Sequence, residues 1–292
     1  MSTDTAIVPP PLATPLAHEP GCALLPGLVP AEVCDRWRRV AEAHATSVRC
    51  RDVPAIDLRI ACALLADAGV FERYRDLVGA RPACNLDECW LRRQFPPGAA
   101  APGAGPHSWH QDGALRHDFT RPAAAMPGDG QGLLDMLTCW IALAPCGSHA
   151  PGLELVRTER LGLSMPVELG HPAVARRFPE DAFWRPAMAA GDALLLRGDV
   201  LHRTHATPAM RRDRSSLELR FFDGERWPQR LAIDRSVLLD CKRPRRGAAS
   251  PFGPLVPGTR NSESTASAQG PAGAHYQARR HRRCAAQNSD AK

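Results

Sequence analysis

The sequence has very little lysine and no long apolar run. Lys242 and Lys292 are its only lysines among 37 basic residues, so nearly all of the positive charge is arginine. No stretch approaches the roughly 20 apolar residues that a membrane-spanning helix needs. Residues 1–20 lack the basic start and apolar core of a secretion signal. These absences favour a soluble, cytoplasmic protein with no membrane partner.

Closely paired cysteines are also absent. The ten cysteines are scattered from Cys22 to Cys284, and none belongs to a Cys-x-x-Cys pair. The sequence therefore predicts neither a zinc knuckle nor a thioredoxin-type redox motif. Reduced thiols in a cytosol are the expectation.

The basic charge is concentrated at the C-terminal end. Residues 241–292 carry ten Lys/Arg against two acidic residues, a net charge of +8, whereas the whole chain has +6. The other 240 residues therefore have a net charge of −2 and offer no track for phosphates. Nucleic acid is not an expected partner of the body of the protein.

Composition divides the chain into three parts. Residues 1–20 and 241–292 are rich in Pro, Ala, Ser or Arg, and we expect both to be disordered. Residues 21–240 contain the apolar segments of one domain. The 28 prolines and 23 glycines of the chain favour a fold with many turns over a helical bundle.

The domain begins with helical periodicity and continues with short strands. Helices are predicted from Pro30 to about Ala45, over Asp57–Ala68 and over Val70–Val78. Strands are predicted over 86–95, 137–143, 153–156, 193–196, 200–205 and 215–222. Loops are expected at 96–107 and 113–132, and 157–190 has no clear period. This order predicts a mainly β sandwich or barrel faced by helices.

A candidate metal site comes from His110 and Asp112. Alternate residues of an extended segment point to the same side, so these two can reach one ion while Gln111 points elsewhere. A second histidine on a later strand would complete the two-His, one-carboxylate triad of non-haem Fe(II) oxygenases. His202 is the preferred third ligand, and His205 is the alternative.

The segment 214–221 alternates polar and apolar side chains. Its polar face carries Arg214, Ser216, Glu218 and Arg220. In an ordinary half-exposed strand this face would meet water. If it lines a barrel instead, it offers a guanidinium fork for a carboxylate, and Arg92 is a candidate partner for Glu218.

Together these segments resemble the phytanoyl-CoA dioxygenase (PhyH) family of Fe(II)/2-oxoglutarate oxygenases. The resemblance covers about residues 21–225. The matching segments are Leu24–Leu28, Ser108–Gly113, Thr138–Leu143, Pro151–Val156, Gly191–Leu196, and Leu201–His202 through Arg214. It implies a double-stranded β-helix, which is a cupin-like jelly roll, with helices packed on one sheet.

The resemblance also implies roles for individual residues. Iron would be bound by His110, Asp112 and His202. The co-substrate 2-oxoglutarate would be bordered by Arg214, Gln111, Trp140, Ser216 and Arg92. In this group Arg214 would hold the distal carboxylate, although Arg212 is an alternative anchor, and Arg92 faces either co-substrate or substrate. Because Asp112 is present, the resemblance implies hydroxylation rather than halogenation.

The sequence therefore predicts a dioxygenase that uses Fe(II), 2-oxoglutarate and O2 to hydroxylate a small organic molecule, releasing succinate and CO2. Two alternatives remain at this point. An alkylation-repair-type nucleic-acid demethylase also has paired arginines, which Arg214 and Arg220 resemble. A jelly-roll binding protein with an inert metal site would produce no succinate.

Overall fold

The computed structural model describes residues 17–44, 47–99, 105–120, 132–231 and 238–241, which belong to one compact unit. The segments 1–16 and 242–292 lie outside the described residues, and the predictions of disorder for them stay predictions. Folded structure begins before the expected start at Gly21, because β1 (Ala17–Glu19) pairs with β2 (Cys22–Leu25).

Two antiparallel sheets form the body of this unit. The larger sheet has the order β1-β2-β9-β6-β11-β4-β12, and β5 pairs with both β11 and β3. Its further strands are β3 (Val48–Arg49), β4 (Pro82–Asn85), β5 (Trp90–Gln94), β6 (Leu137–Ala142), β9 (Ala193–Arg197), β11 (Arg214–Asp223) and β12 (Leu238–Asp240). The smaller sheet has the order β10-β7-β8, from His202–His205, Gly152–Val156 and Phe183–Trp184. This is the predicted jelly roll.

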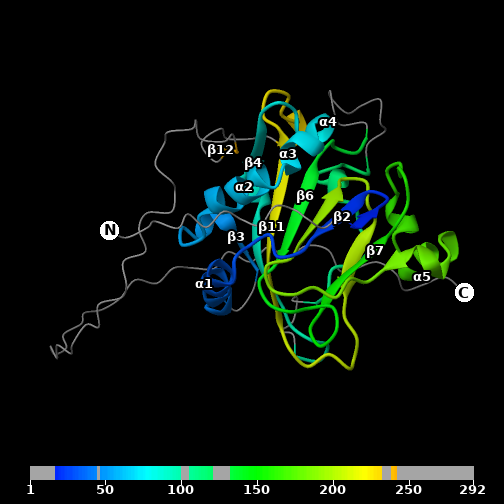
Figure 1. Ribbon diagram of the computed structural model, residues 1–292. Helices are drawn as coiled ribbons and strands as arrows, with labels where there is room; N and C mark the ends of the chain where they lie inside the picture. The colour runs from blue at the N-terminus through cyan, green and yellow to red at the C-terminus, as the bar shows by residue number, and fades with distance from the viewer. Residues whose placement is uncertain (1–16, 45–46, 100–104, 121–131, 232–237, 242–292) are drawn as a thin grey trace, which may run out of the picture. The chain divides into compact units, whose positions relative to one another are not determined.

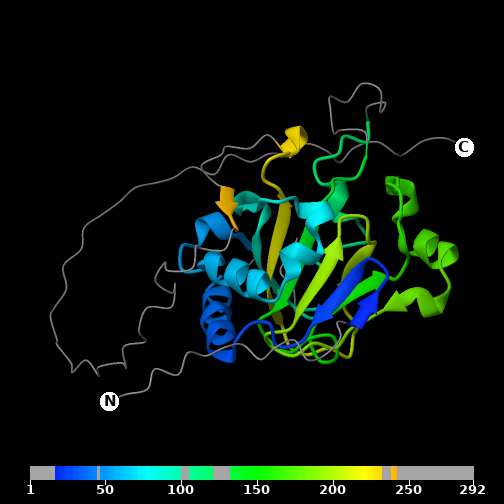
Figure 2. The same ribbon diagram turned by 45° about the horizontal axis from the view of Figure 1, so that its top comes forward.

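Four helices cover one face of the larger sheet. They are α1 (Ala31–Glu42), α2 (Leu58–Asp67), α3 (Val70–Arg73) and α4 (Arg75–Val78). Figures 1 and 2 show them, blue to cyan, on the side of the sheet away from α5 (His171–Arg177). Trp37 and Leu65 of these helices share one buried cluster with Leu217, Leu219 and Phe221 of β11. The apolar half of the 214–221 alternation therefore faces the helices, as its period predicts.

A second apolar cluster fills the space between the two sheets. It includes Trp140, Leu153, Leu155, Leu194 and Leu196. Because Leu217 and Leu219 face the helices, the polar residues that alternate with them point toward this second space. Strand alternation thus places Arg214, Ser216, Glu218 and Arg220 inside the jelly roll, and all four are buried.

The boundaries differ from the predictions at three places. The strand expected over 86–95 begins only at Trp90, because the Asn85 side chain accepts a hydrogen bond from the Asp87 amide and caps a 3-10 turn over Leu86–Glu88. The third predicted helix is split at Tyr74 into α3 and α4. The unassigned segment 157–190 contains α5 and β8. None of the helices within the described ranges could cross a membrane.

Candidate metal centre

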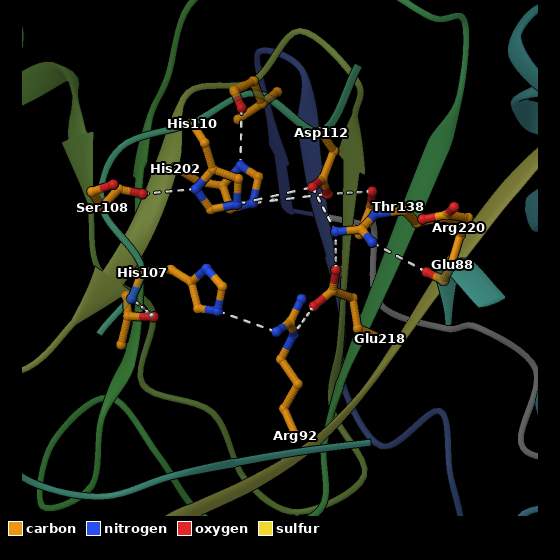
Figure 3. Close-up of polar contacts among 12 residues, drawn as sticks. Glu88, Arg92, His107, Ser108, His110, Asp112, Thr138, His202, Glu218 and Arg220 are labelled. Atoms are coloured by element: carbon orange, nitrogen blue, oxygen red, sulfur yellow. Dashed lines mark hydrogen bonds and ion pairs between the residues drawn. The ribbon is translucent and has the colours of Figure 1, made fainter. Parts of the chain in front are cut away.

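His110 and Asp112, two residues apart, meet the distant His202 between the sheets. Ligand atoms of His110, Asp112 and His202 all lie within 4.8 Å of one another. Two backbone hydrogen bonds of 3.0 Å join His110 to His202, so the loop that carries His110 adds a short bridge at the end of β10. Asp112 follows at the start of a 3-10 turn. The predicted triad is therefore assembled by backbone pairing between the loop and β10 (Figure 3).

The backbone also sets the tautomer of both histidines. Nδ1 of His110 lies 2.7 Å from the Ser108 carbonyl, and Nδ1 of His202 lies 3.0 Å from the Val200 carbonyl. A carbonyl only accepts, so each Nδ1 carries the proton and each Nε2 keeps a free lone pair. Burial, followed by the neighbouring His202, lowers the pKa of His110 to about 4. At neutral pH His110 is thus a neutral ligand with Nε2 directed at the centre.

Asp112 is held as a carboxylate. The Thr138 hydroxyl donates to Oδ2 at 2.6 Å, and Nη2 of Arg220 donates to Oδ1 at 2.8 Å. Burial alone would raise the pKa of Asp112, but Arg220, the two imidazoles and Thr138 hold it well below its usual range. Oδ1 is 3.9 Å from Nε2 of His110, and Oδ2 is 3.8 Å from Nε2 of His202. Two imidazole nitrogens and one carboxylate oxygen form a donor set that suits Fe(II).

The alternative ligand His205 is excluded by strand alternation. His202 and Thr204 of β10 are buried toward the inside, whereas Arg203 and His205 are only half-buried on the other face. His205 lies in register with Gly152 of β7, away from Asp112. The structure therefore groups His202, and not His205, with His110 and Asp112.

Alanine substitutions at His202 and His205 are expected to have very different effects on Fe(II) affinity. Loss of a residue that only supports a metal ligand lowers metal affinity about 10–100-fold. His202→Ala removes a ligand itself, so we expect Fe(II) affinity to fall by more than that. His205→Ala should change the Fe(II) dissociation constant less than about twofold, because it leaves the supporting contacts intact. Anaerobic Fe(II) titration of both variants measures the difference. Equal losses would contradict the assignment.

A chain of ion pairs supports Asp112 from behind. Arg220 contacts Glu218, and Glu218 accepts a hydrogen bond from Nε of Arg92, which is the partner predicted for it. Nη1 of Arg92 is 3.2 Å from Nε2 of His107, and Nη1 of Arg220 donates to the Glu88 carbonyl at 3.1 Å. Figure 3 shows this chain of contacts, which runs from Asp112 of the triad to His107. Asp112, Glu218, Arg92 and Arg220 thus each have a neighbour of opposite sign, as burial demands.

Removing Arg220 tests this support. Arg220→Met leaves Asp112 and Glu218 buried without their shared cation, so we expect a loss of about 3–5 kcal/mol in the free energy of unfolding. Metal affinity should fall about 10–100-fold, because Asp112 loses its orienting donor. Urea unfolding and Fe(II) titration measure the two effects. Arg226→Met, which breaks an ion pair of a highly exposed arginine, is the control and should change neither.

Arg214 forms the other end of the same cavity. Its side chain is 2% exposed, its guanidinium lies 5.0 Å from the centre of the Trp140 ring, and Nη1 donates to the Gly152 carbonyl at 3.3 Å. Within the described part of the chain, Nε of Arg214 and the Ser216 hydroxyl are buried without a hydrogen-bond partner. Burial lowers the pKa of Arg214 to about 10, which leaves it charged at neutral pH. Arg212 is exposed on the preceding loop and does not reach this space.

The cavity brings most of the predicted residues together. Its walls include His110, Asp112, His202, Arg92, Trp140 and Arg214, joined by His107, Thr138, Leu153, Leu196, Thr204 and Glu218. Sequence reasoning missed Thr138, although it shares a strand face with Trp140. It also gave no role to His107, which is exposed but reaches the cavity edge through its contact with Arg92.

Gln111 is placed differently from the expectation. Its amide nitrogen donates to the Gly162 and Asp199 carbonyls at 3.0 and 2.8 Å, and its oxygen accepts from the Ser164 amide at 2.8 Å. These bonds occupy the amide and direct it away from the triad. Gln111 therefore ties the metal-binding loop to the segment after β7 and is not among the residues that line the cavity.

The chain is similar to several solved structures. EctD from S. alaskensis with bound iron has a TM-score of 0.51 and 13% identity, covering 70% of this chain and 73% of that chain. HygX from Streptomyces hygroscopicus with nickel and 2-oxoglutarate bound has a TM-score of 0.49 and 16% identity, covering 70% and 83%. The non-heme alpha-ketoglutarate-dependent epimerase SnoN from nogalamycin biosynthesis has a TM-score of 0.42 and 14% identity, covering 70% and 78%. The EctD match shows the same fold.

The sequence itself gives the family. No curated protein matches the chain. The family described as phytanoyl-CoA dioxygenase (PhyH) matches residues 17–212, about two thirds of the chain. That range contains His110, Asp112 and His202, the residues that meet in the metal centre. The chain therefore belongs to the phytanoyl-CoA dioxygenase family and is an Fe(II)/2-oxoglutarate-dependent oxygenase.

Proposed function

We propose that this protein hydroxylates a small organic molecule, consuming O2 and 2-oxoglutarate and releasing succinate and CO2. The observation that carries the proposal is the position of Arg214, a buried guanidinium with an unused donor that shares one cavity with the His110–Asp112–His202 triad. A buried cation with an unfilled hydrogen bond is costly unless a ligand completes it. A dicarboxylate that also reaches the metal would do so.

The two ends of the cavity fit the two ends of 2-oxoglutarate. We assign the distal carboxylate to Arg214 and the Ser216 hydroxyl, whose orphaned polar atoms lie on the same face of β11. A guanidinium fork matches the geometry of a carboxylate. Trp140 lies against Arg214, keeps water from it and strengthens the ion pair in this buried site. When bound with 2-oxoglutarate and O2, iron supplies the oxidant for an unactivated C–H bond.

The substrate side is assigned to the edge of the cavity that His107 and Arg92 form. Both line the cavity, and Arg92 is held in place by Glu218. Leu153 and Leu196 supply apolar wall between the sheets. We therefore propose that this edge orients a substrate carrying at least one polar group, while the apolar wall excludes water from the C–H bond to be oxidised.

Isotope labelling tests the reaction directly. With Fe(II), 2-oxoglutarate and 18O2, a panel of small-molecule candidates is screened for succinate by mass spectrometry. Hydroxylation predicts one labelled oxygen in the product, one in succinate, and equal amounts of the two. The triad variant His202→Ala is the control and should release no succinate.

Three results would contradict the proposal. An unlabelled product, or a product formed without matching succinate, would exclude hydroxylation by this route. Turnover of a methylated oligonucleotide in the same assay, with none for small molecules, would favour nucleic-acid demethylation. Absence of succinate with every candidate, together with no binding of 2-oxoglutarate, would favour an inert binding protein.

A further inference from the structure

A second group of metal-ligating side chains lies outside the cavity between the sheets. It consists of Cys62 in α2, Cys84 in β4 and Cys241 directly after β12, and their sulfur atoms all lie within 4.8 Å of one another. All three are buried in the cluster that joins the helices to the larger sheet. Cys84 is the cross-strand neighbour of Phe221, which faces the helices, so the sheet separates these thiols from the iron centre.

The sulfur atoms already interact. Sγ of Cys62 and Sγ of Cys241 are 2.8 Å apart and in direct contact. The hydrogen bond from Cys241 lowers the pKa of Cys62 to about 6. Thiolate, not thiol, is the form that binds metals. Cys62 is therefore the member that loses its proton most readily, whereas the pKa values of Cys84 and Cys241 are raised by their contacts with the neighbouring thiols and by burial.

The surroundings allow an ion to enter. Cys241 forms part of the wall of a surface pocket that is also lined by Phe71, Arg75 and Gly79. The pocket opens beside α3 and α4, so the thiols are not sealed inside the core.

We propose that Cys62, Cys84 and Cys241 form a binding site for a soft, thiophilic metal ion, with zinc as the physiological occupant. Three sulfur donors without oxygen or nitrogen select ions such as Zn(II), Cu(I) or Cd(II) over Mg(II) or Ca(II). The third sulfur is the deciding feature, because a disulfide would use only two. Zinc–sulfur bonds of about 2.3 Å place neighbouring sulfurs about 3.8 Å apart, so Cys62 and Cys241 separate by about 1 Å as their protons leave to water.

Such a site would fasten the end of the domain. It joins β12, the last described strand, to α2 and β4, which lie far earlier in the chain. An ion that binds only the folded state stabilises it by mass action. The site is therefore structural and does not depend on the proposed hydroxylation.

The test uses the full chain, purified under reducing conditions and stripped of metal. Cd(II) is added as the probe, since cadmium–thiolate bonds absorb in the ultraviolet, whereas Cd(II) bound at the His110–Asp112–His202 triad does not produce this band. The band is expected in the parent chain, in His110→Ala and in Cys34→Ser, a matched control for a buried cysteine outside the group. It should be lost in Cys84→Ser and in Cys241→Ser. In the His110→Ala background, which removes a ligand of the triad, zinc should raise Tm when all three thiols are present and when Cys34→Ser is added, but not when Cys84→Ser or Cys241→Ser is added.

Other outcomes would overturn the proposal. No ultraviolet band in the parent chain, or an equal band in both Cys84→Ser and Cys241→Ser, would show that these thiols do not bind the ion. A Cys62–Cys241 disulfide that forms in air, in a reduced protein that retains no zinc on dialysis, would make the group a redox pair instead. If Cys84→Ser fails to fold, Cys241→Ser decides, because its sulfur lies at the pocket surface.

Discussion

Replacing Arg214 with alanine is expected to raise KM for 2-oxoglutarate on the order of 100-fold. Charge-assisted hydrogen bonds contribute about 1.5–3 kcal/mol each, and a guanidinium fork makes two of them with a carboxylate. A net loss of about 3 kcal/mol corresponds to roughly two factors of ten in affinity. Steady-state kinetics with varied 2-oxoglutarate, and the binding constant from anaerobic calorimetry, measure the effect.

Matched variants separate the fork from simple charge. Arg214→Lys keeps the charge without the fork, so an intermediate rise in KM is expected. Arg212→Ala changes an exposed neighbour on the preceding loop and should leave KM unchanged. A large effect at Arg212 with none at Arg214 would reverse the assignment of the anchor.

The second large effect is expected at Asp112. Asp112→Ala removes the only anionic ligand of the triad, and turnover should become undetectable, with an Fe(II) affinity more than about 100-fold weaker. It also leaves Arg220 buried beside an empty space, so this variant should lose stability. Circular dichroism and metal analysis after dialysis follow the two consequences separately.

Asp112→Asn provides the folded control. An amide oxygen still accepts from Arg220, and the amide nitrogen can donate to Thr138, so most of the stability should return. Activity should not return, because the amide carries no charge for the metal. Hydroxylation retained by either Asp112 variant would show that the metal is bound elsewhere.

Much of this centre is readable from strand alternation. The period of two along 214–221 places Arg214 on the face opposite to Leu217, and the structure buries that face between the sheets. The same rule makes His110 and Asp112 point together and separates His202 from His205. The pairing of Arg92 with Glu218 follows the same alternation. Arg92 lies directly across from Ser216 in the neighbouring strand, so it is a diagonal neighbour of Glu218 on the same face.

Other features depend on contacts that have no local pattern. His107 lies in a loop whose sequence resembles any solvent-exposed loop, and only its contact with Arg92 holds it at the cavity. Gln111 was misplaced because the segment that binds its amide, around Gly162 and Ser164, has no recognisable period. The thiol group was missed for the same reason. Cys62, Cys84 and Cys241 have no metal-site spacing in sequence, and only the packing of α2 against the sheet unites them.

The central claim is that His110, Asp112 and His202 bind one iron ion to which 2-oxoglutarate can coordinate while Arg214 holds its far end. Anaerobic titration of the metal-free protein with Fe(II) and then 2-oxoglutarate tests it most directly. For the parent chain we predict a visible charge-transfer band that saturates at one equivalent of each. The band should be lost in His202→Ala. In Arg214→Ala it should need a much higher 2-oxoglutarate concentration to saturate. A parent chain that shows no band at saturating Fe(II) and 2-oxoglutarate would contradict the account.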